Sequence, residues 1–455
     1  MAAQVSRRVF LKVAGNIAGA ATLAACAPAK KGLGKRGNAA AQLVYQDWRT
    51  DYFSAMAQRL LEEFHATHSN IHVFYTPDPP NLTEKMLSDF QAESAPDVFA
   101  GCCDYFSVWA QKGYLLDLRP YIEAELKADD RDDWDPAHYR ALQLPDGAQY
   151  ALPKHQGALA IYYNKDLFDK YKVPHPAPGW THDDYRSAML PFAQRRSSDA
   201  DELLWGSMFD VSWERIQAHV NAWGGHFVDP NDAMRSMMSE QPALEAFEWL
   251  RKRMWEDHAM ASRLDAQNLN VTDAFCRRRL AMVEDGSWSL KRILDSAPFR
   301  VGVAPFPGGP AGQTTISSID GFAIYNGTRY PEDAWEFMKF LISPRYNRAM
   351  IRSHLLQPAR ASLVNEWLTE ARNQYPEKTR EINLEVFTEA RVKGYAAAPE
   401  IFNQQEAAQQ LAAAAWERIY TLGRAPVSLM SEVSAQIDAA QAPSQRSARE
   451  QRREV

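Results

Sequence analysis

The chain has 455 residues, of which 46% are hydrophobic and 24% are charged, a composition typical of a globular protein long enough for two domains. Its formal net charge of −6 at pH 7 gives no indication of a nucleic-acid-binding surface, which would need an excess of Lys and Arg. None of its 4 cysteines has a CxxC spacing. The sequence therefore predicts neither a disulfide framework nor a zinc site of that kind, and no metal or cofactor is expected.

The first thirty or so residues have the pattern of an export signal. Arg7 and Arg8 precede a weakly apolar stretch, Val13 to Ala25, which is too short to span a bilayer as a stable helix. The paired arginines match the twin-arginine pattern. Leu23-Ala-Ala-Cys26 resembles a bacterial lipobox, which implies cleavage before Cys26 and diacylation of its thiol. A plain secretory signal with an incidental cysteine is the alternative. We expect residues 1–25 to be the signal peptide and residues 26–42 to be the lipidated cysteine and a flexible tether.

Strand-like and helix-like stretches alternate after the tether. Strands are predicted at Leu43–Tyr45, Ile71–Tyr75 and Pro96–Ala100, and helices at Tyr52–His65 and Leu82–Ala92. This order favours a parallel sheet wrapped by helices. In such sheets, ligands bind beyond the carboxyl ends of the strands.

The stretch from Gln149 to Phe168 has the pattern of a hinge. Tyr150–Leu152 is followed by Pro153, which fixes φ and lacks an N–H, and the apolar run restarts at Gly157. We therefore predict that Lys154-His155-Gln156 is a link between two sheets rather than part of one. An ordinary strand pair with a loop remains the alternative. Asp166 is predicted to cap the helix that follows.

A second α/β unit is predicted after this link. Thr181 is expected to cap a helix, and Trp213–Trp223 and Ala243–Trp255 have a helical apolar period. Arg279–Val283 is followed by Asp285-Gly-Ser-Trp288, in which two small residues allow a tight turn at a strand end.

Several phrases of this sequence resemble the family 1 extracellular solute-binding proteins of ABC importers, the carbohydrate-type group. Tyr150-Ala-Leu-Pro153 followed by Ile161-Tyr-Tyr-Asn-Lys-Asp-Leu-Phe168 carries the resemblance most clearly. Ala95-Pro-Asp-Val-Phe99, Trp109–Leu118 and Gly286-Ser-Trp288 agree with it in order and spacing, and the matches span roughly residues 42 to 430.

The resemblance implies an α/β, two-lobed fold of the type II periplasmic-binding-protein kind, in which each lobe is a sheet flanked by helices and a multi-strand hinge joins them. It places lobe 1 at residues 43–153 plus 304–355 and lobe 2 at residues 154–303 plus 356–435. Residues 436–455 are polar and are predicted to form a disordered tail.

The resemblance also implies a function: an extracytoplasmic binding lipoprotein, monomeric and not an enzyme, that delivers a sugar or oligosaccharide to an ABC transporter permease. Two alternatives stay open. One is a glycerol-phosphate or polyol ligand, for which Lys154 and Arg49 are candidate cations. The other is a secreted glycoside hydrolase or lyase, although the sequence supplies no identifiable pair of catalytic carboxylates.

A sugar site combines aromatic rings, which stack on C–H faces, with carboxylates and amides, which bind hydroxyls. Trp288 is the strongest candidate, because the family often places a stacking aromatic residue there, with a core position as the alternative. Asp104 matches a position that can accept ligand hydroxyls, with an Asx turn as the alternative. The remaining candidates lie at strand ends, in the link or in the second unit: Asp47, Trp48, His155, Gln156, Trp213, Asp320, Gly321 and Tyr395.

Overall fold

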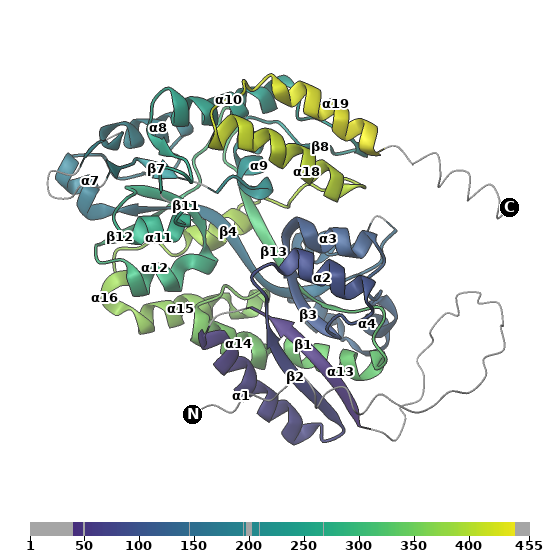
Figure 1. The fold of residues 1–455 in the computed structure, drawn as a ribbon. Helices are drawn as coiled ribbons and strands as arrows, with labels where there is room; N and C mark the ends of the chain where they lie inside the picture. Colours follow the sequence, from purple (N-terminus) through teal and green to yellow (C-terminus); the bar gives the residue numbers. More distant parts are fainter. Residues whose placement is uncertain are drawn as a thin grey trace, which may run out of the picture. The chain divides into compact units, whose positions relative to one another are not determined.

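The computed structural model describes residues 40–48, 51–144, 146–193, 195–196, 203–208, 210–266 and 268–441. The predicted signal peptide, Cys26, most of the tether and Arg49 lie outside these residues, and so does the end of the chain from residue 442. The described part from Ala40 onward is one compact unit of strands and helices (Figure 1).

One large sheet runs through this unit, with the strand order β11-β4-β13-β3-β1-β2, while β12 pairs with β4 and β14 with β13. The strands β1, β2 and β3 are parallel, and β13 is antiparallel to both β3 and β4. The strand bounds are β1 (Ala41–Asp47), β2 (Ile71–Pro77), β3 (Val98–Cys102), β4 (Leu152–Asn164), β11 (Met282–Gly286), β12 (Val301–Pro305), β13 (Thr315–Ile324) and β14 (Ala396–Ala397).

Lobe 1 is built on the strands at the β2 end of the sheet. Its apolar cores contain buried side chains such as Phe53, Leu60 and Phe64, which repeat along one face of the first helix, as the predicted period requires. The helices of this lobe are α1 (Asp51–Thr67), α2 (Leu82–Gln91), α3 (Cys103–Gln111), α4 (Arg119–Glu125), α5 (Ala128–Asp132), α6 (Pro136–Ala141), α13 (Pro331–Leu341) and α14 (Pro344–His354).

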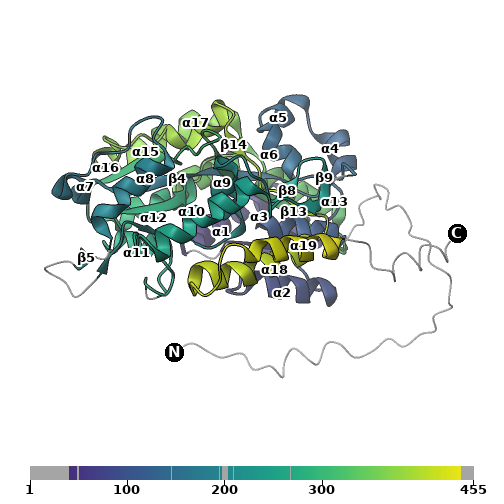
Figure 2. The same ribbon diagram turned by 90° about the horizontal axis from the view of Figure 1, so that it is seen from above.

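Lobe 2 is built around the second half of β4, where β11 and β12 pair with it. The helices α18 and α19 pack against each other on this lobe (Figure 1), and in the view from above they overlap (Figure 2). Short two-stranded sheets join β5 (Arg195–Arg196) to β6 (Leu203–Leu204), β7 (Ser207–Met208) to β10 (Met260–Ala261), and β8 (Val228–Asp229) to β9 (Asp232–Ser236). Its helices are α7 (Lys165–Tyr171), α8 (His182–Met189), α9 (Trp213–Ala222), α10 (Gln241–Trp255), α11 (Val271–Cys276), α12 (Leu290–Ser296), α15 (Val364–Gln374), α16 (Pro376–Thr379), α17 (Val386–Val392), α18 (Gln405–Trp416) and α19 (Leu429–Gln441).

Three segments pass between the lobes. Leu152 at the start of β4 packs in the core of lobe 1, whereas Leu159 and Ile161 pack in a core of lobe 2. β13 pairs with β4 along this passage, and the chain after α14 lies against the same strand, since the Gln156 N–H donates to the Gln357 carbonyl. The hinge is therefore made of backbone segments that are hydrogen-bonded to one another.

The predicted break at Pro153 is wrong. β4 continues from Leu152 to Asn164, but its register shifts: Pro153 pairs with Gly321 and His155 with Asp320, so Lys154 is an extra, bulged residue. A bulge leaves one residue unpaired, and a proline that lacks an N–H is tolerated beside it. The sequence signal at Pro153 thus marks a local irregularity rather than the end of the strand.

The helix caps were predicted in part. Thr181 caps α8 in a capping box with Asp184, which confirms that prediction. The cap of α7 is Asn164, whose side chain accepts from the Leu167 N–H, so the prediction of Asp166 as the cap was wrong by two residues. The predicted tail also begins too early, because α19 extends to Gln441, with Ile437 buried.

Candidate functional site

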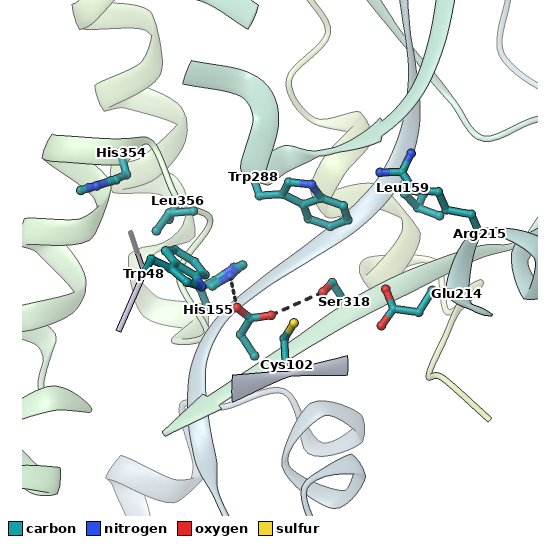
Figure 3. A pocket seen from close by; sticks show the side chains of 11 residues that line it. Trp48, Cys102, His155, Leu159, Glu214, Arg215, Trp288, Ser318, His354 and Leu356 are labelled. Atoms are coloured by element: carbon teal, nitrogen blue, oxygen red, sulfur yellow. Dashed lines mark hydrogen bonds and ion pairs between the residues drawn. The ribbon is translucent and has the colours of Figure 1, made fainter. Parts of the chain in front are cut away.

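A cavity of about 400 Å³ lies between the lobes, beside the hinge strands (Figure 3). Its lining comes from the carboxyl ends of β1, β3 and β11, from β4 and β13, from the first turn of α9, and from the end of α14 and the segment after it. This is where parallel sheets commonly bind ligands. The lining residues are Trp48, Cys102, His155, Leu159, Glu214, Arg215, Trp288, Ser318, Asp320, His354 and Leu356.

Two indole rings from different elements border the cavity. Trp48 directly follows β1, and its ring meets the imidazole of His155 edge-on, with 4.9 Å between ring centroids. Trp288 follows β11 and packs partly against apolar cores of both lobes. The positions of Gly157 and Gly286 leave room for this ring, because a Cβ on either glycine would collide with it. Both indoles remain only partly buried and border the cavity.

A hydrogen-bonded polar pair lies between these rings on the hinge strands. His155 Nε2 is 2.8 Å from Asp320 Oδ2, and Ser318 Oγ is 3.5 Å from Asp320 Oδ1, as the dashed lines in Figure 3 mark. The imidazole of His138, from α6, is buried nearby, with its Nε2 3.2 Å from the Asp320 carbonyl oxygen. Burial, together with the neighbouring His155, lowers the pKa of His138 to about 4, so this imidazole is neutral at pH 7.

The first turn of α9 contributes charged groups that the sequence analysis missed. Arg215 Nη1 donates to the Glu284 carbonyl oxygen at 2.5 Å, and its Nη2 lies 3.4 Å from Asp285 Oδ1. The Asp285 carboxylate also accepts from the Thr272 hydroxyl at 2.6 Å. Arg215 is thus held at the cavity by the end of β11. The only sequence signal was the polar pair Glu214-Arg215 directly after Trp213 at a predicted helix start.

His354 was also missed, because it is the last residue of a helix and no strand-end pattern marks it. Burial and the nearby charge of Lys154 lower the pKa of His354 to about 3, so its imidazole faces the cavity as a neutral group. Leu356 follows it in the third hinge segment and adds an apolar contact.

The structure places four of the predicted residues in the cavity lining: Trp48, His155, Trp288 and Asp320. Asp47 lies beneath the lining and is fully buried, with its Oδ1 2.5 Å from Lys154 Nζ. Trp213 is 4% exposed and packs in a core of lobe 2, where its Nε1 donates to the Glu400 carbonyl. Asp47 therefore lies next to the lining without being exposed to the cavity, whereas Trp213 lies in the core of lobe 2.

The other predicted residues are also not part of the lining. Gly321 packs against Ala151 and Phe106 inside lobe 1. Gln156 is buried in the hinge beside Gln357, and Tyr395 lies next to β13, where its carbonyl accepts from the Thr315 N–H. Asp104 lies in α3, and its side chain is not among those that the structure describes.

The lining offers aromatic faces, a carboxylate paired with an imidazole, a guanidinium and a hydroxyl. Such groups suit a ligand that has both apolar faces and hydroxyls.

The described side chains form no cluster of three or more His, Cys, Asp or Glu that would suit a metal ion. Within the described part of the chain, no helix has the length and apolar character that a membrane crossing requires.

Relatives of this chain are found among bacterial binding proteins. It is 25% identical over 323 residues to an uncharacterized lipoprotein of Streptomyces antibioticus, a match that covers 66% of this chain and 65% of the relative. It is 22% identical over 358 residues to the galactooligosaccharide-binding protein of Bacillus subtilis, covering 76% and 79% of the two chains. The chain spans less than two thirds of the first relatives' own length, 65% of the Streptomyces lipoprotein and 61% of a putative binding protein of Brucella abortus.

Solved structures share the fold over most of the chain. A substrate-binding protein of Listeria monocytogenes in complex with cycloalternan has a TM-score of 0.78 and 21% identity, covering 88% of this chain and 98% of that one. The GacH receptor of Streptomyces glaucescens, solved unliganded and in complex with acarbose, has a TM-score of 0.71 and 22% identity, covering 88% and 97%. A Mycobacterium tuberculosis protein in complex with glycerophosphocholine has a TM-score of 0.70 and 18% identity, covering 86% and 97%. These likenesses confirm the predicted two-lobed α/β fold.

A family model covers the part of the chain that contains β2, β3, the hinge strands β4 and β13, and most of the cavity lining. The matched family is described as bacterial extracellular solute-binding protein, and the match extends over residues 46–348. This match confirms the resemblance noted in the sequence, and the chain belongs to the bacterial extracellular solute-binding proteins.

Proposed function

We propose that this protein binds a sugar or oligosaccharide in the cavity between its lobes and delivers it to the permease of an ABC importer. The observation that carries the proposal is the lining itself, in which Trp48 and Trp288 border one cavity together with the Asp320–His155 pair. Indole faces stack on the C–H faces of sugar rings, and the polar pair accepts from and donates to hydroxyls. The names of the Bacillus and Listeria relatives, which refer to carbohydrate ligands, support the same class.

Capture requires hinge closure. Lining groups come from both sides of the hinge, for example Trp48 from lobe 1 and Arg215 from lobe 2. A ligand that touches both lobes at once binds the closed arrangement more tightly than the open one, so binding shifts the population toward closure. The chemistry needed is recognition alone, and the family consists of binding proteins, which argues against the hydrolase or lyase alternative.

The location and the chain boundaries complete the proposal. We propose that the protein works outside the cytoplasmic membrane as a monomer, exported by residues 1–25 and anchored by lipid on Cys26. The extracellular family and the lipoprotein relative support this location. The boundaries near residues 153, 304 and 355 remain our proposal for the passages between the lobes.

A glycerol-phosphate ligand is the second candidate, favoured by the shared fold with the glycerophosphocholine-bound mycobacterial protein. A phosphodiester would need a cation in the cavity. Lys154, considered for this role in the sequence, has a fully buried side chain that is paired with Asp47. Arg215 is the cationic side chain that borders the cavity, and it already donates to Glu284 and contacts Asp285.

A thermal-shift screen of the chain from Ala27 onward would test the proposal. Ligands to compare are mono- and oligosaccharides, polyols and glycerol phosphodiesters. A ligand present at 100 times its Kd stabilises the folded state by about 2.7 kcal/mol, which raises the Tm measurably. A sugar hit recovered chemically unchanged supports the proposal. A hit confined to glycerol phosphodiesters favours the second candidate, a hit that is consumed favours an enzyme, and a flat screen contradicts the sugar proposal.

A further inference from the structure

Two consecutive side chains of the hinge strand reach the same indole ring. In a regular strand, Lys154 and His155 would point to opposite faces of the sheet. The bulge at Lys154 changes this, because it adds one unpaired residue between Pro153 and His155. As a result, Lys154 Nζ lies 3.4 Å from the centroid of the Trp48 ring, while the His155 ring meets the same indole edge-on at 4.9 Å.

Lys154 is also paired with the residue that precedes Trp48. Its Nζ is 2.5 Å from Asp47 Oδ1, and both side chains are fully buried. The Asp47 carboxylate accepts from the backbone N–H of Trp48 at 2.7 Å and from the Tyr45 hydroxyl. The ion pair therefore contacts Trp48 in two ways, through its backbone and through one face of its ring.

This arrangement connects distant parts of the chain. β4 and β1 are not neighbours in the sheet, since β13 and β3 lie between them. Lys154 thus joins the hinge strand to the end of β1 across two intervening strands, beside the rings of Phe53 and Phe322 at 5.2 and 5.4 Å. A buried ammonium is costly unless it is paired and packed, and here Asp47 and the aromatic rings provide both.

We propose that Lys154 is a positioning residue of the ligand site: from the bulge in the hinge strand it fixes the orientation in which Trp48 presents its indole to the cavity. The side chain of Lys154 has no exposed surface, and Lys154 is not among the residues that line the cavity. Its effect on binding is exerted through Trp48. This inference rests on the proposed function, because it assumes that a sugar stacks on Trp48.

A double-mutant cycle tests this role. Kd values for the sugar found in the screen would be measured by calorimetry for the wild-type protein, Lys154→Met, Trp48→Ala and the double variant. We expect Lys154→Met to weaken binding about tenfold in the wild-type background, as loss of a desolvated cation–π contact and of the ring orientation would do. In the Trp48→Ala background, the same substitution should change Kd less than about twofold, because no ring remains to be positioned.

A purely structural role predicts a different pattern. If Lys154 only stabilised the fold, Lys154→Met would weaken binding by the same factor in both backgrounds, and this result would overturn the proposal. No loss in either background would overturn it as well. Lys339→Met is the matched control, since Lys339 is an ion-paired lysine of lobe 1 that bonds Glu125 on the surface. It should leave Kd unchanged.

A second variant covers the case in which Lys154→Met fails to fold because Asp47 is left buried and unpaired. Asp47→Asn/Lys154→Met removes both charges and keeps an acceptor for the Trp48 N–H, and its loss of affinity should likewise depend on Trp48. If the wild-type protein binds no sugar, the proposed function fails. If the wild-type protein binds sugar but neither cycle shows coupling, only the role of Lys154 fails.

Discussion

The indole of Trp288 lies directly against Gly157 of the hinge strand. A Cβ placed on Gly157 would come within 2.8 Å of both Trp288 Cε3 and Ser287 Oγ, closer than real Cβ contacts occur. Gly157 also pairs with Ser318 of β13, so the ring rests on the strand pair that connects the lobes. The position of this ring in the cavity is therefore set by the hinge backbone.

Gly157→Ala should consequently weaken ligand binding. The added methyl group must displace the Trp288 ring or Ser287, and we expect the Kd for sugar to rise by about tenfold or more. Calorimetric titration measures this change. Gly308→Ala is a suitable control, because its Cβ would meet its nearest neighbour at an ordinary 3.6 Å. Equal affinities for the two alanine variants would contradict the steric argument.

Substitutions of two tryptophans should affect different properties of the protein, one its affinity for the ligand and the other its free energy of unfolding. Trp288→Ala should weaken binding by more than about 1.4 kcal/mol, a tenfold change in Kd, with a smaller effect on folding because the ring is only partly buried. Trp213→Ala should instead lower the free energy of unfolding by about 3–5 kcal/mol, because its ring is packed in the core beside Phe227 and Trp416. Urea denaturation and calorimetry on both variants check the two effects. An unchanged Kd for Trp288→Ala would remove this residue from the site.

Part of the site was predictable because it depends on position along a strand. Trp48 and Trp288 follow the ends of β1 and β11, and Asp320 lies within β13, so each belongs to or adjoins a strand that can be read from local sequence. The alternation of strands and helices likewise predicted the fold class. These features depend on contacts between residues close in the chain.

The remaining features depend on contacts between distant residues. The pairing of Lys154 with Asp47 joins residues 107 positions apart, and no local pattern indicates it. Pro153 signalled an irregularity, but only the register with β13 shows that it is a bulge within one strand. Trp213 was predicted as a pocket residue, but its ring packs against Phe402 and Trp416 in the core of lobe 2, and only these distant contacts show it.

The stability of the protein should depend on pH through Asp78. Burial, and then the negative charge of Asp47, raises the pKa of this carboxyl to about 7, whereas in an unfolded chain it is close to 4. The folded state thus binds this proton more tightly than the unfolded state does. Its stabilising contribution is present at low pH and is lost as the pH rises from about 4 through about 7.

Asp78→Asn removes this ionisation. Its free energy of unfolding should exceed that of the wild-type protein by roughly 1–3 kcal/mol at pH 8, and the difference should shrink toward zero near pH 4. Urea denaturation of both proteins across this pH range is the measurement. A difference that is constant with pH would show that the carboxyl ionises in the folded protein as it does in the unfolded chain.

The lobes also touch away from the hinge, where the end of α3 meets the start of α18. Gln111 Nε2 donates to the Phe402 carbonyl at 2.9 Å, and Lys112 Nζ is 2.5 Å from a Glu406 carboxylate oxygen. If these contacts form only when the lobes approach, they add to the stability of the closed state, and Gln111→Ala/Lys112→Met should raise the Kd for sugar about three- to tenfold. The contribution of the exposed ion pair should decrease at high salt.

Lys85→Met, which breaks an ion pair with Asp89 inside one helix, is the matched control and should leave Kd unchanged. Equal Kd values for all three proteins would mean that this contact persists in both the open and the closed state.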